Sequence, residues 1–218
     1  MNSLKFKIFT FSFLVLLSFY SCSPNYLKGY EIKNNTDLKV PTIFNGKLIK
    51  ALYKANLIVM GNELSGLLLL KKTNPSEYRI VFMSELGLKY FDFGVNYTKE
   101  KPEFTNYYLL SPMQRGEVEK ILFNDLCILL SEFSDNIKYK VYRNNKTGDL
   151  AILNNVDEYN YVAFRYSGKD KIEKIQWNSK PEGRSMISIN NYKGNLPSDL
   201  LMENSKYSLR LQLKLVEN

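Results

Sequence analysis

Residues able to carry catalytic chemistry are few in this chain, and their types and spacing argue against covalent catalysis. The 218 residues include no histidine, which excludes Ser–His–Asp and Cys–His nucleophile pairs as well as histidine metal sites. The carboxylate pairs Asp157-Glu158 and Asp199 with Glu203 have no distinctive spacing and are expected in loops, which gives little support to glycosidase chemistry. We therefore expect a protein that is not an enzyme and that needs no metal and no cofactor.

A short motif with a catalytic precedent has a structural explanation. Lys146-Thr147-Gly148 looks like part of the Lys-Thr-Gly signature of penicillin-binding proteins, but no Ser-x-x-Lys partner is placed to serve it. Because the motif follows two asparagines, we expect it to form a hairpin turn.

The two cysteines stand in different settings. Cys127 lies among Leu126, Ile128 and Leu129 in a predicted helix, so we expect a buried, inert thiol. Cys22 ends an N-terminal segment with a basic start at Lys5 and Lys7 and an apolar run over residues 8–19. This is the layout of a secretory signal peptide, and the run falls short of the roughly 18 residues that span a bilayer.

The cysteine directly after Ser21 resembles the lipobox of bacterial lipoproteins, in which that cysteine becomes the acylated first residue of the mature chain. The resemblance implies that Cys22 carries palmitate-type acyl chains, and two or more chains give stable membrane anchoring. Ser23 is not the aspartate that retains enteric lipoproteins in the inner membrane, which favours the outer membrane. An ordinary signal peptide with an incidental Cys22 is the alternative.

The charge of the chain favours lipid over nucleic acid as a partner. The formal charge is +8, and cleavage after Ser21 would remove Lys5 and Lys7 and leave 197 residues with a charge of +6. The excess of lysine is moderate and spread along the chain, which suits acidic lipid headgroups better than a nucleic-acid groove. A single domain of this size can bury a substantial core.

Three segments follow from composition and periodicity: a signal peptide over residues 1–21, a polar tether over 22–42, and one β-rich domain over 43–218. In the domain, alternating or continuously apolar runs bounded by turn residues predict strands. The predicted strands cover residues 53–59, 64–70, 78–83, 88–93, 104–110, 137–143, 150–153, 159–166, 172–177, 186–192 and 207–215.

One long helix interrupts the strands. Ser111 is expected at its cap, Pro112 at its first position and Gln114 in a capping box. An apolar stripe at helical spacing then predicts about five turns; it consists of Val118, Ile121, Leu122, Leu126, Leu129 and Leu130. The fold class is therefore α+β, with about ten antiparallel strands in a curved sheet that wraps the helix or in a closed barrel that holds it at the side.

Two predicted strands, 64–70 and 78–83, are apolar on both faces. One face of a single sheet would cover the helix, and the other needs a second cover or an apolar ligand. Plain core packing is the alternative for each strand.

The order of short motifs is similar to that of the LolB type of outer-membrane lipoprotein localisation factors, relatives of the periplasmic carrier LolA. The similarity covers roughly residues 48–216 in order. It rests on Ser65-Gly66-Leu67-Leu68-Leu69, Tyr78-Arg79-Ile80-Val81-Phe82, Leu86-Gly87, Phe91-Asp92-Phe93, Ile172-Glu173-Lys174-Ile175, Ile187-Ser188-Ile189-Asn190-Asn191-Tyr192 and Leu196-Pro197-Ser198-Asp199-Leu200.

The resemblance implies an open half-barrel, covered by a helix, that binds acyl chains of lipoproteins or another lipid. It implies acceptance of cargo from a soluble LolA-like carrier and insertion into the outer membrane on its periplasmic side. An exposed leucine between two early strands serves insertion in that family, and Leu86 is the matching position, preceded by Glu85 where proline is usual. Candidates for the apolar groove are Tyr53, Leu57, Leu68, Ile80, Phe82 and Phe91.

Two other functions remain open. A structural lipoprotein would close the same sheet around its helix and leave no cavity. A surface lipoprotein would bind glycans or peptides through exposed tyrosine-rich faces.

Overall fold

The structure, a computed structural model, describes residues 29–33, 42–44, 48–98, 102–130, 139–147, 149–156, 159–165, 171–179 and 183–217. Within these residues the chain forms thirteen strands, one short 3-10 helix and one α-helix. In chain order they are β1 (Tyr30–Lys33), β2 (Lys50–Val59), β3 (Asn62–Asn74), β4 (Glu77–Met83), β5 (Lys89–Asn96), β6 (Glu103–Leu109), η2 (Ser111–Met113), α2 (Gly116–Leu130), β7 (Tyr139–Asn144), β8 (Leu150–Val156), β9 (Tyr159–Arg165), β10 (Lys174–Ser179), β11 (Gly183–Lys193), β12 (Leu196–Asn204) and β13 (Leu209–Glu217).

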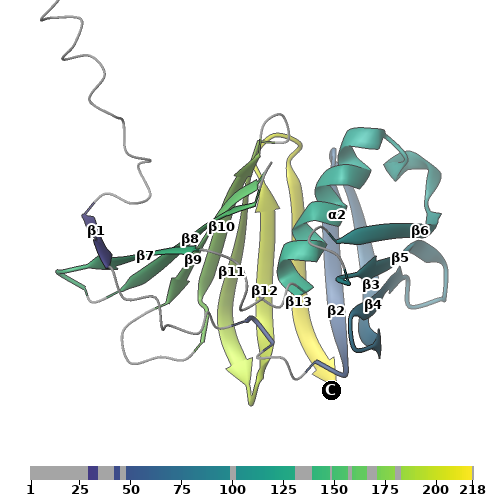
Figure 1. Ribbon diagram of the computed structural model, residues 1–218. Helices are drawn as coiled ribbons and strands as arrows, with labels where there is room; N and C mark the ends of the chain where they lie inside the picture. The colour runs from purple at the N-terminus through teal and green to yellow at the C-terminus, as the bar shows by residue number, and fades with distance from the viewer. Residues whose placement is uncertain are drawn as a thin grey trace, which may run out of the picture.

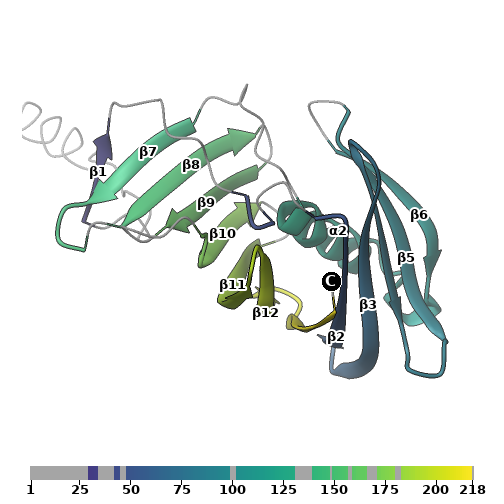
Figure 2. The same cartoon turned by 90° about the horizontal axis from the view of Figure 1, so that it is seen from below.

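All described strands belong to one antiparallel sheet, in the order β1-β7-β8-β9-β10-β11-β12-β13-β2-β3-β4-β5-β6. The last strand, β13, lies between β12 and β2 and so joins the early strands to the late ones. The edge strands β1 and β6 do not pair with each other, so the sheet is open. Figures 1 and 2 show it curled around α2, which lies on its concave side. The predicted α+β class and open curved sheet are confirmed, with more strands than the expected ten.

Side-chain alternation explains which face of the sheet forms the core. On β2 the residues at odd positions from Ala51 to Val59 are buried, and those between them are exposed or half-buried. The same alternation holds on β4, where Tyr78, Ile80 and Phe82 are buried. Because side chains on a strand point alternately to opposite faces, these residues all lie on the concave side. The predicted alternation of Tyr53, Ala55, Leu57 and Val59 is confirmed.

The helix starts later and is shorter than its sequence predicts. Ser111–Met113 forms the separate 3-10 helix η2, without a side-chain cap. The Gln114 side chain donates to the carbonyl of Leu109 at 2.7 Å and not to a capping box. The α-helix therefore begins at Gly116 and spans 15 residues, about four turns. Its stripe is confirmed, because Val118, Ile121, Leu122, Leu126, Leu129 and Leu130 are all buried.

Two strands were not predicted. β12 contains Pro197, which reads as a strand breaker; it is accommodated beside the register shift at Asn191 and Tyr192 of β11. Asp199 and Glu203 thus lie on a strand, and their predicted loop position was wrong. β1 forms within the predicted tether by pairing with β7, a contact between distant segments that local composition does not report.

Several predicted features lie outside the described residues. They are the signal peptide over 1–21, the anchor Cys22, most of the tether, and Asp157-Glu158. Among the described residues, no helix has the length and hydrophobicity needed to cross a membrane.

Candidate functional site

The turn between β4 and β5 presents an apolar tip. Leu86 is 99 % exposed and Leu88 is 58 % exposed, whereas most large apolar side chains of this domain are buried. Burial of a leucine side chain stabilises a fold by about 2 kcal/mol. A fully exposed leucine contributes none of this free energy to folding. The predicted turn is confirmed, and Leu86 lies at its outermost part.

Ser84 holds this turn in place. Its backbone N–H donates to the carbonyl of Leu88 at 2.8 Å, and its carbonyl accepts from the N–H of Gly87 at 3.0 Å. Its side-chain Oγ accepts from the N–H of Leu88 at 3.0 Å. Gly87 has φ +83, a left-handed backbone conformation that residues other than glycine rarely adopt. Leu86 is therefore held on an ordered turn.

The neighbouring strand β3 positions the same turn. A Cβ at Gly66 would lie 2.0 Å from the carbonyl oxygen of Met83 and 2.9 Å from Cα of Ser84. Only glycine lets the base of the turn approach β3 this closely. The Tyr90 hydroxyl donates to the Ser65 carbonyl at 3.3 Å, from the other side of the turn.

The six residues predicted for an apolar groove lie together on the concave face, but each has an exposed fraction of 0 %. They come from four adjacent strands, β2 to β5, and belong to one core that also contains the buried face of α2. They are Tyr53, Leu57, Leu68, Ile80, Phe82 and Phe91. In this conformation they are packed beneath the helix, and contact with a ligand stays a prediction.

Aromatic rings connect this cluster to the helix. Phe82 and Phe91 have ring centroids 5.4 Å apart, and Phe91 stacks on Phe93 at 4.7 Å. Phe93 contacts Phe104 at 4.9 Å, and Phe104 contacts Phe123 of α2 at 4.2 Å. Such ring pairs contribute about 0.5–1.5 kcal/mol each beyond their burial. The helix is therefore held to the sheet mainly by apolar and aromatic packing.

Hydrogen bonds also tie the helix to the strands and loops beside it. The Tyr97 hydroxyl donates to the carbonyl of Cys127 at 2.7 Å, and the Asn106 amide donates to the Glu119 carboxylate at 2.6 Å. The predicted burial of Cys127 is confirmed, and this burial raises the pKa of its thiol well above the ordinary value, as expected of an unreactive cysteine.

A buried carboxyl group at the helix–sheet boundary was missed by the sequence analysis. Asp125 of α2 is 1 % exposed, and burial raises its pKa to about 7. The Ser185 hydroxyl and the Trp177 indole partly oppose this rise, although neither carboxyl oxygen receives a hydrogen bond of ordinary geometry within the described residues. The signal was present in the sequence, since Asp125 interrupts an otherwise apolar helix face.

Asp125 adjoins a small polar cluster on the central strands. The Asn204 amide donates to the Ser185 hydroxyl at 2.8 Å, and both residues are buried. Near the other end of β12, the Tyr53 hydroxyl donates to the Pro197 carbonyl at 2.9 Å. Burial, and next the nearby Tyr192, raise the pKa of Tyr53. These groups orient side chains within the apolar interior and form no arrangement with catalytic geometry.

Residues considered for chemistry have structural roles where the structure describes them. Lys146 and Thr147 lie in the hairpin turn between β7 and β8, where Asn144 Oδ1 accepts both of their N–H groups at 2.9 and 3.3 Å. Asp199 pairs in register with Lys214, and Glu203 Oε1 lies 3.8 Å from Arg210 Nε. No group of three or more Cys, Asp or Glu residues within the described ranges could hold a metal ion.

Comparison with solved structures supports the fold. A DUF1329 family protein from Desulfovibrio piger has a TM-score of 0.52 and 9 % sequence identity, with 82 % of this chain and 92 % of that chain covered. A domain described as an outer membrane lipoprotein-sorting protein from Vibrio parahaemolyticus has a TM-score of 0.48 and 11 % identity, covering 78 % and 84 %. A LolA superfamily protein from Nitrosomonas europaea has a TM-score of 0.44 and 10 % identity, covering 77 % and 83 %.

Sequence comparison adds no relative: no protein-family model and no curated protein matches the chain. At these identities the structural likeness concerns the fold alone. The chain is thus similar in architecture to the DUF1329 family protein, with an open antiparallel sheet curled around a helix.

Proposed function

We propose that this protein is a membrane-anchored lipoprotein that binds acyl chains of lipoproteins, or another lipid, beneath α2 and releases them into a bilayer. No bond is made or broken in this process, so the protein acts as a binding protein and not as an enzyme. The direction of transfer follows from affinity, as acyl chains leave one apolar surface for another and finally for lipid.

The observation that carries the proposal is the full exposure of Leu86 on an ordered turn. An apolar side chain held away from the core has nothing in the described fold to contact. Entry into the acyl region of a bilayer would bury it and contribute about 2 kcal/mol. The sequence resemblance to LolB-type factors assigns this position the same role.

The interior supports the binding step. The six groove candidates share one buried apolar cluster with α2, and in this proposal movement of α2 away from the sheet exposes them to acyl chains; they are Tyr53, Leu57, Leu68, Ile80, Phe82 and Phe91. The helix is joined to the sheet through apolar and aromatic packing and carries the buried carboxyl of Asp125.

The proposal includes the cellular setting. Cys22 is the acylated anchor, residues that follow it form the link to the domain, and the domain faces the periplasm from the outer membrane of a bacterium. A soluble LolA-like carrier is the proposed donor of the cargo.

Delivery to liposomes tests the role of Leu86. We expect Leu86→Glu to leave folding and cargo binding unchanged and to reduce delivery of a fluorescent acylated peptide at least about tenfold, because a charged tip enters the acyl region unfavourably. Ile49→Glu is a matched control, because Ile49 is also an exposed apolar residue, at 78 %. It lies just before β2, near the turn between β3 and β4 and away from the turn that carries Leu86. Delivery at the parent rate by Leu86→Glu would refute the assignment.

A second function is favoured by the complete burial of the six groove candidates. A structural lipoprotein with a permanently closed core has the same packing. Mass spectrometry of the purified domain distinguishes the two functions. Co-purified acyl lipid supports the first, and its absence together with no binding of an added fluorescent fatty acid supports the second.

A further inference from the structure

A second apolar surface lies on the convex face of the sheet, opposite the core. It consists of five half-buried side chains on β2, β3 and β4, and we call it the outer patch: Leu52, Leu67, Leu69, Val81 and Met83. None of them belongs to the core cluster or packs against it. In register, Leu52 pairs with Leu69 and Leu69 with Val81, while Leu67 pairs with Met83, so the five are direct neighbours.

Cationic side chains occupy the adjacent register positions on the same face. Lys71 pairs with Lys50 on one side and with Arg79 on the other, which places three cations in one row next to the patch. The remaining cations flank the patch at the row of Leu67, on β2, β13 and β5. We call all six the basic frame: Lys50, Lys54, Lys71, Arg79, Lys89 and Lys214.

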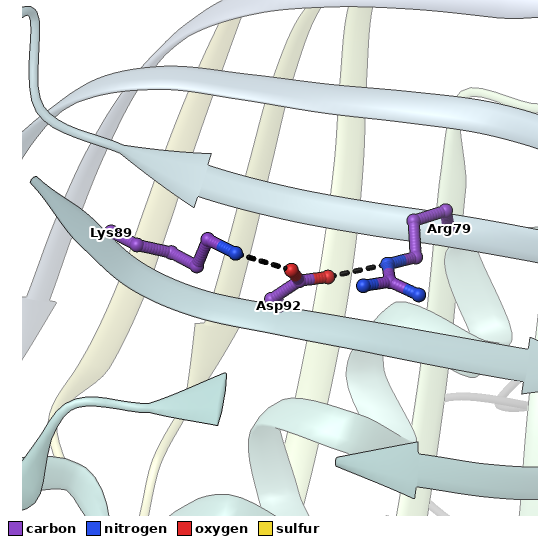
Figure 3. A network of polar contacts seen from close by, with 3 residues as sticks. All are labelled: Arg79, Lys89 and Asp92. Atoms are coloured by element: carbon purple, nitrogen blue, oxygen red, sulfur yellow. Dashed lines mark hydrogen bonds and ion pairs between the residues drawn. The ribbon is translucent and has the colours of Figure 1, made fainter. Parts of the chain in front are cut away.

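Carboxylates in this region are fewer, and the most buried one is already compensated. Asp92 accepts from Arg79 Nε at 2.5 Å and from Lys89 Nζ at 2.7 Å, as Figure 3 shows. Other acids near the patch on this face include Asp199, the partner of Lys214, Glu77, two residues before Arg79 on β4, and Glu63, four residues before Leu67 on β3. The six cations of the frame outnumber these carboxylates, so the charge around the patch is positive.

Exposed tyrosines extend the same surface toward β6. Tyr107 and Tyr108 are 56 % and 40 % exposed. The guanidinium carbon of Arg79 lies 3.5 Å from the centre of the Tyr107 ring, and a Cβ at Gly94 would lie 2.9 Å from that ring, so the ring lies flat on the outer face. Tyrosine has an apolar ring and a polar hydroxyl, a combination enriched where hydrocarbon meets water.

We infer that this convex face is a docking surface for anionic phospholipid. The aliphatic outer patch contacts the boundary between headgroups and acyl chains, the basic frame contacts headgroup phosphates, and the tyrosines lie at headgroup level. Each lysine near an acidic membrane surface strengthens binding severalfold, and apolar contact adds to this attraction. The inference goes beyond the proposed function, because it concerns how the domain lies on the membrane and does not depend on acyl-chain transfer.

Charge and side-chain type favour this occupant over a second copy of the chain or an acidic protein. Without Lys5 and Lys7 the chain still has a formal charge of +6, so two copies repel each other. Five of the six cations in the frame are lysines, which are flexible point charges on long apolar stems. Such side chains suit the mobile phosphates of a lipid surface better than the fixed carboxylates of a protein interface, which arginine binds in a bidentate geometry.

Vesicle flotation tests the inference on the chain from Ser23 onward, which keeps every described helix and strand. One set of vesicles is pure phosphatidylcholine and the other contains roughly one third phosphatidylglycerol. We expect binding to the anionic vesicles only, weakened at about 0.5 M salt because headgroup attraction is screened. Simultaneous Lys50→Glu, Lys54→Glu and Lys71→Glu should lower the affinity at least about tenfold.

A matched variant controls for total charge. Lys140→Glu, Arg143→Glu and Lys146→Glu make the same charge change at exposed positions of β7 and the turn that follows it. Parent-like binding by this variant supports the convex face as the docking surface. An equal loss in both triple variants would overturn it, since the attraction would then come from overall charge. No vesicle binding, with retention of the parent on immobilised polyglutamate, would assign the face to an acidic protein.

Two further measurements separate this inference from folding effects and from the proposed function. Urea unfolding of both triple variants should match the parent, because all six substituted residues are exposed. Binding of a fluorescent fatty acid in solution should also be unchanged by the substitutions in the frame. If the frame variant loses vesicle binding but still binds the fatty acid normally, the basic frame serves membrane docking and not acyl-chain binding.

Discussion

The concave and convex sides of the sheet differ in how they bury apolar and acidic side chains. Leu68 and Leu69 are neighbours on β3, yet Leu68 is 0 % exposed in the core and Leu69 is half-buried on the outer patch. Asp125 faces the concave interior, where none of the described residues places a cation beside it, and its pKa is raised to about 7. The difference shows that position on a face, and not residue type, decides what each side chain contributes.

Asp92 on the convex face completes the comparison. Burial alone would raise its pKa, but the hydrogen bonds and charges of Arg79 and Lys89 outweigh burial and lower it below its ordinary value. Asp92 and Asp125 are both almost fully buried. The fold therefore stabilises the anionic form of Asp92 at neutral pH and destabilises the anionic form of Asp125.

The largest expected effect concerns the two leucines. Leu68→Ala should lower the free energy of unfolding by about 3–5 kcal/mol, because it leaves a cavity in a closed core. Leu69→Ala should cost about 1 kcal/mol or less, since a half-buried side chain loses little area. Urea unfolding of both variants measures the difference. Equal losses would show that the outer patch is part of a core.

The next effect concerns Asp125. With an ordinary pKa of 3.8 when unfolded and about 7 when folded, this group weakens the fold as pH rises from about 4 to 7. Asp125→Asn should therefore raise the free energy of unfolding by about 2–4 kcal/mol at pH 8 and have little effect at pH 4. Urea unfolding across this range provides the measurement. The same pH dependence in parent and variant would contradict the assignment.

A smaller effect of opposite sign is expected for Asp92. Its lowered pKa contributes stability above the unfolded value of 3.8, and this is lost as pH falls through the folded pKa. Asp92→Asn should cost about 1–2 kcal/mol at pH 7, because Arg79 and Lys89 are partly exposed and solvent screens them. In a double-mutant cycle with Arg79→Ala, the double variant should lose less stability than the sum of the two single variants. Losses that add strictly would mean that Asp92 and Arg79 do not interact.

The smallest effect on stability belongs to the turn. Leu86→Glu should change the free energy of unfolding by less than about 0.5 kcal/mol, because the leucine contacts nothing that folding buries. A thermal melt compares it with the parent, and a loss above about 1 kcal/mol would indicate a contact that supports the fold.

Local pattern was a good guide where one residue type dominates one face. The alternation from Tyr53 to Val59 and the helical stripe from Val118 to Leu130 both predicted burial correctly, because the period of side chains follows from backbone geometry. Pattern failed for β12, where a loop was expected at Asp199 and Glu203, and for β1, whose pairing with β7 joins segments far apart in the chain. Strand pairing between distant segments depends on partners that a local window does not contain.

The sequence by itself determined the α+β class, the apolar turn around Leu86 and Gly87, and the absence of histidine chemistry, since these depend on composition and short-range backbone preferences. Only the tertiary structure decided that Leu86 is exposed while Leu68 is enclosed, that Asp125 is buried with a raised pKa, and that six cations surround the outer patch. Each of these depends on register between strands and on the placement of α2. Burial and charge compensation are properties of neighbours in space, which the fold brings together from segments separated along the chain.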